Sequence, residues 1–179
     1  MSEFDANQVL ELETERLILR KITETNSKDI YKLQSRPEVM RFIGKGVPRS
    51  EEEALSLFKL LLDHQNECGF SLCPTYEKSS GVLIGFAGLV HLECDISNPE
   101  VEVGYWFLPE YWGKGYATEA AKACIEWAFT HLSIDKIVGI THPDHKRSQH
   151  VLKKSGLKYI GASIYRGNDV HRFEVMRQG

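Results

Sequence analysis

The chain has 179 residues, of which 42% are hydrophobic and 26% are charged, and its formal net charge is −3. This is the size and composition of one globular domain with a core, and the slightly acidic charge excludes the basic surface that nucleic acids or anionic membranes require. No apolar run approaches the roughly 20 residues that span a bilayer, and the first residues lack the basic and apolar segments of a signal peptide. We therefore expect a cytoplasmic protein without a nucleic-acid or membrane partner.

The first half of the chain predicts a strand, two helices and three further strands. We expect residues 1–10 to form a flexible N-terminus, followed by a strand over 12–22 whose apolar residues alternate. A short helix is predicted after 25–27, with Ile30 and Leu33 facing inward. Ser50 and Glu53 have the spacing of a capping box, which predicts a helix over 50–66. The three strands that follow are predicted at 69–75, 82–92 and 101–108.

The second half alternates helices and strands. An apolar stripe predicts a helix over 116–132, and a strand is expected at 136–141. A helix over 146–155 is predicted to end before Gly156, and two alternating strands are expected at 158–165 and 170–177. Interleaved strands and helices are typical of an α/β fold. With no linker, repeat or low-complexity tract, the sequence predicts one domain over 1–179.

The most informative segment joins the strand at 101–108 to the helix at 116–132 and reads LPEYWGKGYATEA. Gly113 and Gly115 have no Cβ, so the backbone can turn tightly there and approach a ligand closely. The first N–H groups of the following helix have no partner within the helix and carry the positive end of its dipole, which suits phosphate oxygens. Lys114 adds a positive charge. The segment is neither a P-loop nor a G-x-G-x-x-G fingerprint, because Thr118 stands at the third glycine position.

This loop resembles the pyrophosphate-binding loop of the GNAT N-acetyltransferase superfamily, Q/R-x-x-G-x-G/A, with Trp112 departing from the pattern at the first position. The sequence WGKGYATEA is similar to the corresponding segment of the ribosomal-protein N-terminal acetyltransferases (RimJ/RimL-type). The segments ERLILR at 15–20, EVGYW at 102–106 and SQHVLKKSGL at 148–157 look like further parts of that branch. The resemblance covers nearly the whole chain in the same order.

The resemblance implies a GNAT domain with a mixed, mostly antiparallel sheet flanked by helices. It also implies direct transfer of an acetyl group from acetyl-CoA to an amine in a ternary complex, without a covalent enzyme intermediate. In the family the cosubstrate lies in a wedge beside the fourth strand. Backbone groups of Trp106, Phe107 and Leu108 would then pair with the pantetheine arm. The loop Gly113, Lys114, Gly115, Tyr116, Ala117 and Thr118 would hold the pyrophosphate.

Glu102 is the candidate general base. An amine must lose a proton to attack, and an α-amine, with a reference pKa of about 7.7–8.0, needs less help than a lysine-type amine near 10.4. Glu102 shares one face of its strand with Gly104 and Trp106, whereas Val101, Val103, Tyr105 and Phe107 point the other way. The alternative is a solvated strand carboxylate that pairs with a lysine. Both interpretations stay open at this point.

Two residues of the second cofactor segment are further candidates. By resemblance, Ser148 faces the cosubstrate thiol and can donate a hydrogen bond to the leaving thiolate, or it is simply a small residue on the helix. Many related enzymes have a tyrosine acid in this segment, but Leu152 occupies that position here. His145 stands where the family has asparagine, and we expect it beside the cosubstrate or exposed at the helix start. Lys146 or Arg147 can reach the adenosine 3′-phosphate, whereas Lys153 and Lys154 are expected to be helix surface.

The histidines and cysteines predict no metal site. His142, His145 and His150 are close in sequence, but no pair has the i, i+4 spacing of ligands on one helix face and no cysteine is near. The four cysteines are expected to be free thiols in a reducing compartment, because they are far apart in the sequence and form no C-x-x-C pair.

The acceptor is the least determined part of this interpretation. We expect Phe42, Ile43 and the helix over 50–66 to wall the acceptor side. By analogy with the branch, the acceptor is the α-amine of a peptide or protein N-terminus. A small amine such as an amino sugar, polyamine or amino acid is the alternative, and so is a non-catalytic acetyl-CoA-binding sensor or partner module. A homodimer is possible by the same analogy, although no interface pattern is visible.

Overall fold

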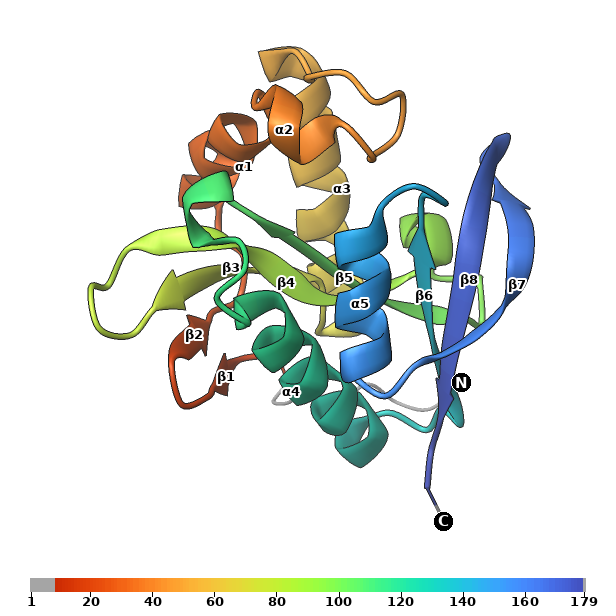
Figure 1. Cartoon of the computed structure of the whole chain (residues 1–179). Helices are drawn as coiled ribbons and strands as arrows, with labels where there is room; N and C mark the ends of the chain where they lie inside the picture. The colour runs from red at the N-terminus through yellow and green to blue at the C-terminus, as the bar shows by residue number, and fades with distance from the viewer. Residues whose placement is uncertain (1–8, 179) are drawn as a thin grey trace.

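The computed structural model describes residues 9–178, and Figure 1 shows a central sheet with helices packed on it. Its helices are α1 (Ser27–Gln34), α2 (Pro37–Met40), α3 (Glu51–Cys68), α4 (Tyr116–His131) and α5 (Lys146–Lys154). Its strands are β1 (Leu12–Glu13), β2 (Leu17–Leu19), β3 (Leu72–Glu77), β4 (Leu83–His91), β5 (Val101–Phe107), β6 (Lys136–Thr141), β7 (Lys158–Tyr165) and β8 (Asn168–Met176). Short 3₁₀ turns lie at Glu24–Asn26, Leu92–Cys94 and Pro109–Tyr111. The element order confirms the expected α/β fold.

The eight strands form one sheet in the order β1-β2-β3-β4-β5-β6-β8-β7. Every neighbouring pair is antiparallel except β5 and β6, which run parallel. This confirms the mixed, mostly antiparallel sheet. The parallel joint is short, since only Val101 and Glu102 of β5 pair with Ile137 and Val138 of β6. Beyond Glu102 the two strands part.

Two apolar cores lie on the two faces of the sheet, because alternate residues of each central strand point to opposite sides. The face covered by α4 holds Leu89 of β4, Val103 of β5 and Cys124 of α4. The other face is covered by α1 and α3 and holds Phe86 of β4, Ile30 and Phe58. Figure 1 shows α4 and α5 in front of the sheet and α1, α2 and α3 together at one end. Ile30 and Leu33 are buried as predicted.

The N-terminal segment differs from the single strand expected over 12–22. It forms two short antiparallel strands, β1 and β2, joined by a turn. The Thr14 hydroxyl oxygen accepts the Leu17 amide at 3.0 Å, which fixes the turn. Of the N-terminus expected to be flexible, residues 1–8 lie outside the described residues. Leu10 is fully buried, and its amide donates to the Gly69 carbonyl at 2.8 Å.

The remaining differences are one missed helix and element ends that shift by a few residues, such as the start of β3 at Leu72 instead of residue 69. The capping box of Ser50 and Glu53 is present, and α3 runs to Cys68 before Gly69 closes it in the left-handed conformation. The sequence analysis missed α2, a single turn that begins at Pro37. The strand predicted at 136–141 is confirmed at both ends as β6. None of the helices within residues 9–178 is long and apolar enough to cross a membrane.

Candidate active site

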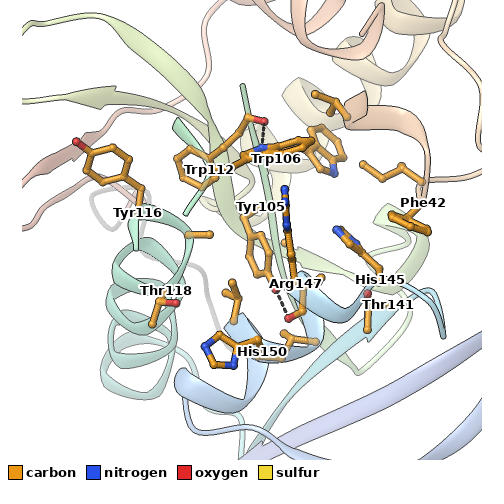
Figure 2. A pocket seen from close by; sticks show the side chains of 18 of the residues that line it. Phe42, Tyr105, Trp106, Trp112, Tyr116, Thr118, Thr141, His145, Arg147 and His150 are labelled. Atoms are coloured by element: carbon orange, nitrogen blue, oxygen red, sulfur yellow. Dashed lines mark hydrogen bonds between the residues drawn. The ribbon is translucent and has the colours of Figure 1, made fainter. Parts of the chain in front are cut away.

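A cavity of about 910 Å³ opens where β5 and β6 separate. Its walls come from β5, the end of β6, the loop before α4, the helix α5 and the α2 segment. Figure 2 shows Tyr116 and Thr118 on one side, Phe42 and His145 on the other, and Tyr105 between them. A separation between parallel strands exposes backbone groups of both edges, so an extended ligand with amide groups can enter there.

The loop before α4 has the conformation that its glycines predict. Gly113 has φ +75° and Gly115 has φ +84°, which are left-handed values that side-chain-bearing residues rarely adopt. Gly115 is the N-cap of α4, and no side chain caps the helix there. Within residues 9–178, the backbone amides of residues 113–118 have no protein acceptor. The cluster of free N–H groups at a helix N-terminus therefore fits a pyrophosphate.

Arg16 braces this loop from the turn between β1 and β2. Its guanidinium donates to the Lys114 carbonyl at 2.8 Å and to the Glu119 carboxylate at 2.7 Å, and it lies 4.6 Å from the Tyr116 ring centroid. The Glu119 carboxylate also accepts the Thr14 hydroxyl at 2.6 Å. Burial alone would raise the pKa of Glu119, but the hydrogen bonds from Thr14 and Arg16 lower it overall. These contacts hold the loop before α4 against the turn between β1 and β2.

Glu102 is the last residue of β5 that still pairs with β6, and its side chain lines the cavity. Burial raises the pKa of Glu102 to about 7, although a backbone hydrogen bond with Ile140 and the charges of Arg166 and Arg172 act in the opposite direction. A carboxyl with this pKa is partly ionised at neutral pH. It can therefore accept a proton there, which a general base must do.

Tyr105 and Ser148 meet on the other wall of the cavity. The Tyr105 hydroxyl lies 3.0 Å from Ser148 Oγ and donates to the Ser148 carbonyl at 3.2 Å. Burial raises the pKa of Tyr105 well above its ordinary value, so the phenol keeps its proton at neutral pH. The two hydroxyl groups form a neutral hydrogen-bonding pair at the end of α5 that faces the cavity.

His145 is the N-cap residue of α5 and lines the cavity opposite the loop. Its ring stacks on Phe42 with centroids 4.6 Å apart. Burial, together with the charges of the nearby His142 and Arg147, lowers the pKa of His145 to about 4. His145 is therefore neutral at physiological pH and offers one donor and one acceptor.

Comparison with known proteins identifies the family. The sequence model described as an acetyltransferase (GNAT) domain matches residues 16–158. The chain belongs to the GNAT acetyltransferases. It is 29% identical to "Uncharacterized N-acetyltransferase YoaA" of Bacillus subtilis, over 84% of each chain. It is 28% identical to the spermidine N(1)-acetyltransferase of Escherichia coli, over 82% of this chain and 75% of that protein.

The solved acetyltransferase structure from Agrobacterium tumefaciens has the same fold as this GNAT chain. The TM-score is 0.81 at 24% identity, with 94% of this chain and 95% of that chain covered. The chain is thus a single GNAT domain and an acetyl-CoA-dependent N-acetyltransferase. The unpaired loop amides and the open edges of β5 and β6 are the groups that suit the pyrophosphate and pantetheine parts of acetyl-CoA.

Most residues predicted for the acetyltransferase site line one cavity. These are Glu102, Trp106, Phe107, Gly113, Gly115, Tyr116, Ala117, Thr118, His145 and Ser148. Leu108 does not line the cavity, and its amide donates to the Ile84 carbonyl at 2.9 Å, so its contact with the pantetheine arm stays a prediction. Lys114 does not line it either, and its ammonium nitrogen lies 5.0 Å from the Tyr111 ring centroid.

The acceptor wall of the acetyltransferase also differs in part. Phe42 and Ile43 line the cavity as expected, but no residue of α3 does. Glu38 and Val39 of α2 line the cavity instead. Lys146, Arg147 and Lys154 line the cavity, whereas Lys153 does not. The Arg147 guanidinium lies 5.5 Å from the Trp112 ring centroid, which adds a cation beside the loop.

Arg16, which braces the loop, and Tyr105, which lines the cavity, are two further residues that the sequence analysis did not assign to the site. Arg16 lies 98 residues before the Lys114 carbonyl that it contacts, so no local pattern signals it. Tyr105 was assigned to the apolar face of β5. Its alternation was correct, but that face opens into the cavity where α5 approaches. The available signal was the phenolic hydroxyl of Tyr105 on an otherwise apolar strand face.

Replacing Arg16 with methionine is expected to raise the KM for acetyl-CoA about tenfold, because the loop loses charge-assisted hydrogen bonds worth about 1.5–3 kcal/mol. Steady-state kinetics with varied acetyl-CoA measure this. Arg20→Met is the matched control, because Arg20 pairs with Glu13 at an exposed site away from the loop. Equal KM values in the two variants would contradict the bracing role.

Proposed function

We propose that this acetyltransferase modifies the α-amine of a peptide or protein N-terminus. The observation that carries the proposal is Glu102, a carboxyl at the cavity whose pKa is raised to about 7 by burial. Such a base is matched to an α-amine, whose reference pKa is about 7.7–8.0. It is poorly matched to a lysine-type amine, which holds its proton to about 10.4. The α-amine is already partly neutral at physiological pH and needs a proton acceptor only as it attacks.

The charge of the acceptor wall supports a peptide over a polyamine. A polyamine carries several positive charges and calls for a deep acidic pocket. The carboxylates that line the cavity are Glu38 and Glu102. Glu38 is half-exposed and lies 3.8 Å from Arg36, so its charge is already partnered. Val39, Phe42 and Ile43 make the rest of this wall apolar, which suits the first side chain of a peptide.

We assign the residue roles as follows. Glu102 accepts the proton that the amine loses as it attacks the acetyl carbon. In this step the Tyr105 hydroxyl donates to Ser148 Oγ at 3.0 Å, so the single Ser148 hydroxyl proton is free to donate to the thiolate that leaves. The amides of the Gly113 to Thr118 loop bind the pyrophosphate, and the free edge of β5 at Trp106 and Phe107 binds the pantetheine arm.

Ser148→Ala would then lower kcat without changing the KM for acetyl-CoA, because the hydrogen bond strengthens only as the thiolate forms.

The specific branch belongs to the same proposal. The wording of the loop and the segments at 15–20 and 148–157 is similar to that of ribosomal-protein N-terminal acetyltransferases, which supports a protein substrate. The relative named spermidine N(1)-acetyltransferase keeps a small polyamine as the second candidate. A homodimer and a cytoplasmic location remain predictions from the sequence.

The test is a panel of acceptors with release of the CoA thiol as the readout. It holds peptides that differ in their first residue, the same peptides with blocked N-termini and an internal lysine, spermidine, glucosamine and free amino acids. We expect the highest kcat/KM on a free peptide N-terminus and none on its blocked form. Faster turnover of spermidine or glucosamine would overturn the peptide proposal. Tight binding of acetyl-CoA without turnover of any amine would favour a sensor or partner module.

A further inference from the structure

Three potential metal ligands meet outside the acetyl-CoA cavity, at the end of α3. His64 and Cys68 are four residues apart and therefore lie on the same face of that helix. His91 is the last residue of β4 and faces them. Their ligand atoms, His64 Nε2, Cys68 Sγ and His91 Nδ1, all lie within 4.8 Å of one another. None of the three residues lines the acetyl-CoA cavity.

The tautomer of His64 is fixed by its neighbour. His64 is 3% exposed, and its Nδ1 lies 2.8 Å from the Phe70 carbonyl oxygen. A carbonyl only accepts, so Nδ1 carries the proton and Nε2 presents a lone pair to His91 and Cys68. A histidine that donates its second ring N–H to a backbone carbonyl is the usual arrangement behind a metal ligand.

The spacing of the ligand atoms fits one small cation. His64 Nε2 lies 3.0 Å from His91 Nδ1, and Cys68 Sγ lies 3.7 Å from the same nitrogen. With Zn–N bonds of about 2.0–2.1 Å and Zn–S bonds of about 2.3 Å, tetrahedral ligands lie about 3.3–3.6 Å apart. Shifts of a few tenths of an ångström would bring these two separations to the tetrahedral values, and all three ligand atoms lie within 4.8 Å of one another.

Without a metal, the hydrogen-bonding groups of His64 and His91 cannot all be satisfied. The His91 backbone amide already donates to His64 Nε2 at 3.1 Å. If His91 Nδ1 also carries a proton, two donors compete for one lone pair. If it does not, two lone pairs face each other at 3.0 Å. A cation between the nitrogens removes the second conflict, and His64 Nε2 must then give up the His91 amide, which limits the affinity.

The protonation states permit binding. Burial lowers the pKa of His64. The pKa of His91 is lowered mainly by burial and also by the neighbouring His64. Both imidazoles are therefore neutral near pH 7. Burial and the neighbouring Glu67 raise the pKa of the Cys68 thiol, so the metal must displace its proton.

We propose that His64, Cys68 and His91 form a zinc site with water as the fourth ligand. The set of two imidazoles and one thiolate is one that Zn²⁺ prefers. The site ties the last turn of α3 to the end of β4, so bound zinc stabilises the fold and takes no part in acetyl transfer. The sequence analysis considered a different group of histidines, because a helix pair and a strand residue 23 positions beyond Cys68 share no local pattern.

Cobalt substitution tests the site directly. The full chain, without a polyhistidine tag and stripped of metal by a chelator, is titrated with Co²⁺ and then with Zn²⁺. We expect one equivalent of Co²⁺ to produce a thiolate-to-cobalt charge-transfer band, and one equivalent of Zn²⁺ to remove it. Cys68→Ser should lack the band. Cys94→Ser is the matched control, since Cys94 is also half-buried and only three residues from His91 but outside the group.

The melting temperature gives a second readout that does not depend on acetyl transfer. Zinc binds only the folded chain at this site, so it should raise the melting temperature of the wild type and of Cys94→Ser but not of Cys68→Ser or His64→Gln. Metal-free Cys68→Ser that melts cooperatively, as the metal-free wild type does, shows that the variant folds. A band of equal strength in Cys68→Ser, or no band and no stabilisation in the wild type, would overturn the proposal.

Discussion

Replacing Glu102 with glutamine is expected to lower kcat about 100-fold, the lower end of what a positioned general base contributes. Glutamine keeps the shape and the hydrogen-bonding ability of the side chain but cannot accept the proton of the attacking amine. The KM for acetyl-CoA should change little, since the pyrophosphate loop and the edge of β5 remain intact. Steady-state kinetics with varied acetyl-CoA at saturating peptide measure both constants.

The pH profile separates a base from a merely structural carboxylate. Because the pKa of Glu102 is about 7, the wild-type rate should fall as the pH drops through that value and the carboxylate gains its proton. In Glu102→Gln this limb should disappear, leaving only the limb set by the amine itself. An acceptor of lower amine pKa shifts the second limb and leaves the first in place, which assigns each limb to its group.

Glu100→Gln is the matched control. Glu100 precedes β5 by one residue and pairs with Arg172 and with Lys136 at 2.9 Å, and it does not line the cavity. Those partners lower its pKa, with the Arg172 hydrogen bond as the largest cause. The limb set by Glu102 should persist in this variant and shift at most to lower pH, because the Arg172 charge, freed from Glu100, favours the Glu102 carboxylate. An unaltered rate and profile in Glu102→Gln would remove Glu102 from the mechanism and leave a water chain as the proton acceptor.

Glu102→Gln should lower the rate but raise the stability of the fold above neutral pH. The folded state raises the pKa of Glu102 above its ordinary value of 4.5, so the folded protein holds this proton more tightly than the unfolded chain does. The free energy of unfolding therefore decreases as the pH rises from about 4.5 through 7. Glu102→Gln should melt at a higher temperature than the wild type at pH 8, and this difference should shrink at pH 5. Thermal melts at the two pH values measure it.

Replacing Gly115 with alanine is expected to raise the KM for acetyl-CoA by about tenfold or more, the equivalent of about 1.5–3 kcal/mol of lost hydrogen bonding to a charged group. Gly115 has φ +84°, and a Cβ added there would lie 3.3 Å from the Arg16 guanidinium nitrogen that braces the loop. Relief of either strain turns the first amides of α4 away from the pyrophosphate. Isothermal titration with CoA and steady-state kinetics measure the loss.

The control for backbone strain is Gly167→Ala. Gly167 has φ +76° in the turn between β7 and β8, and a Cβ there would meet nothing within 4 Å. Both variants place alanine in the left-handed region, which costs about 1–2 kcal/mol, so both should lose similar stability. Only Gly115→Ala should lose affinity for CoA. Equal affinities in the two variants would mean that the loop is an ordinary tight turn.

The sequence predicted most of the fold because its elements carry strong local signals. β6 was predicted with both ends correct, and the capping box at Ser50 and Glu53 placed the start of α3. The strand expected over 12–22 was wrong as a single element, since its turn depends on Glu119, whose carboxylate contacts Thr14 from 105 positions away. A pattern read over neighbouring residues contains no such information.

The candidate site divides in the same way. The conformations of Gly113 and Gly115 followed from residue type, because only glycine adopts positive φ without strain. The contact between Tyr105 and Ser148 depends on where α5 packs against β5, and the partnership of His64 with His91 depends on how α3 meets β4. Such meetings of distant elements are set by the packing of the whole domain. The acceptor wall depends on α2, a single turn with almost no sequence signal.

The short joint between β5 and β6 has a consequence for how the domain can be held together. Strand edges with free backbone groups usually lie at the outside of a sheet, where they attract other strands. Here two such edges face each other in the middle of the sheet, beyond Glu102 and Val138. An extended molecule with amide groups at strand-like spacing can bridge them from both sides. Acetyl-CoA would then act as a missing ninth strand, and the gap between β5 and β6 beyond their short joint would be filled only while the substrate is bound.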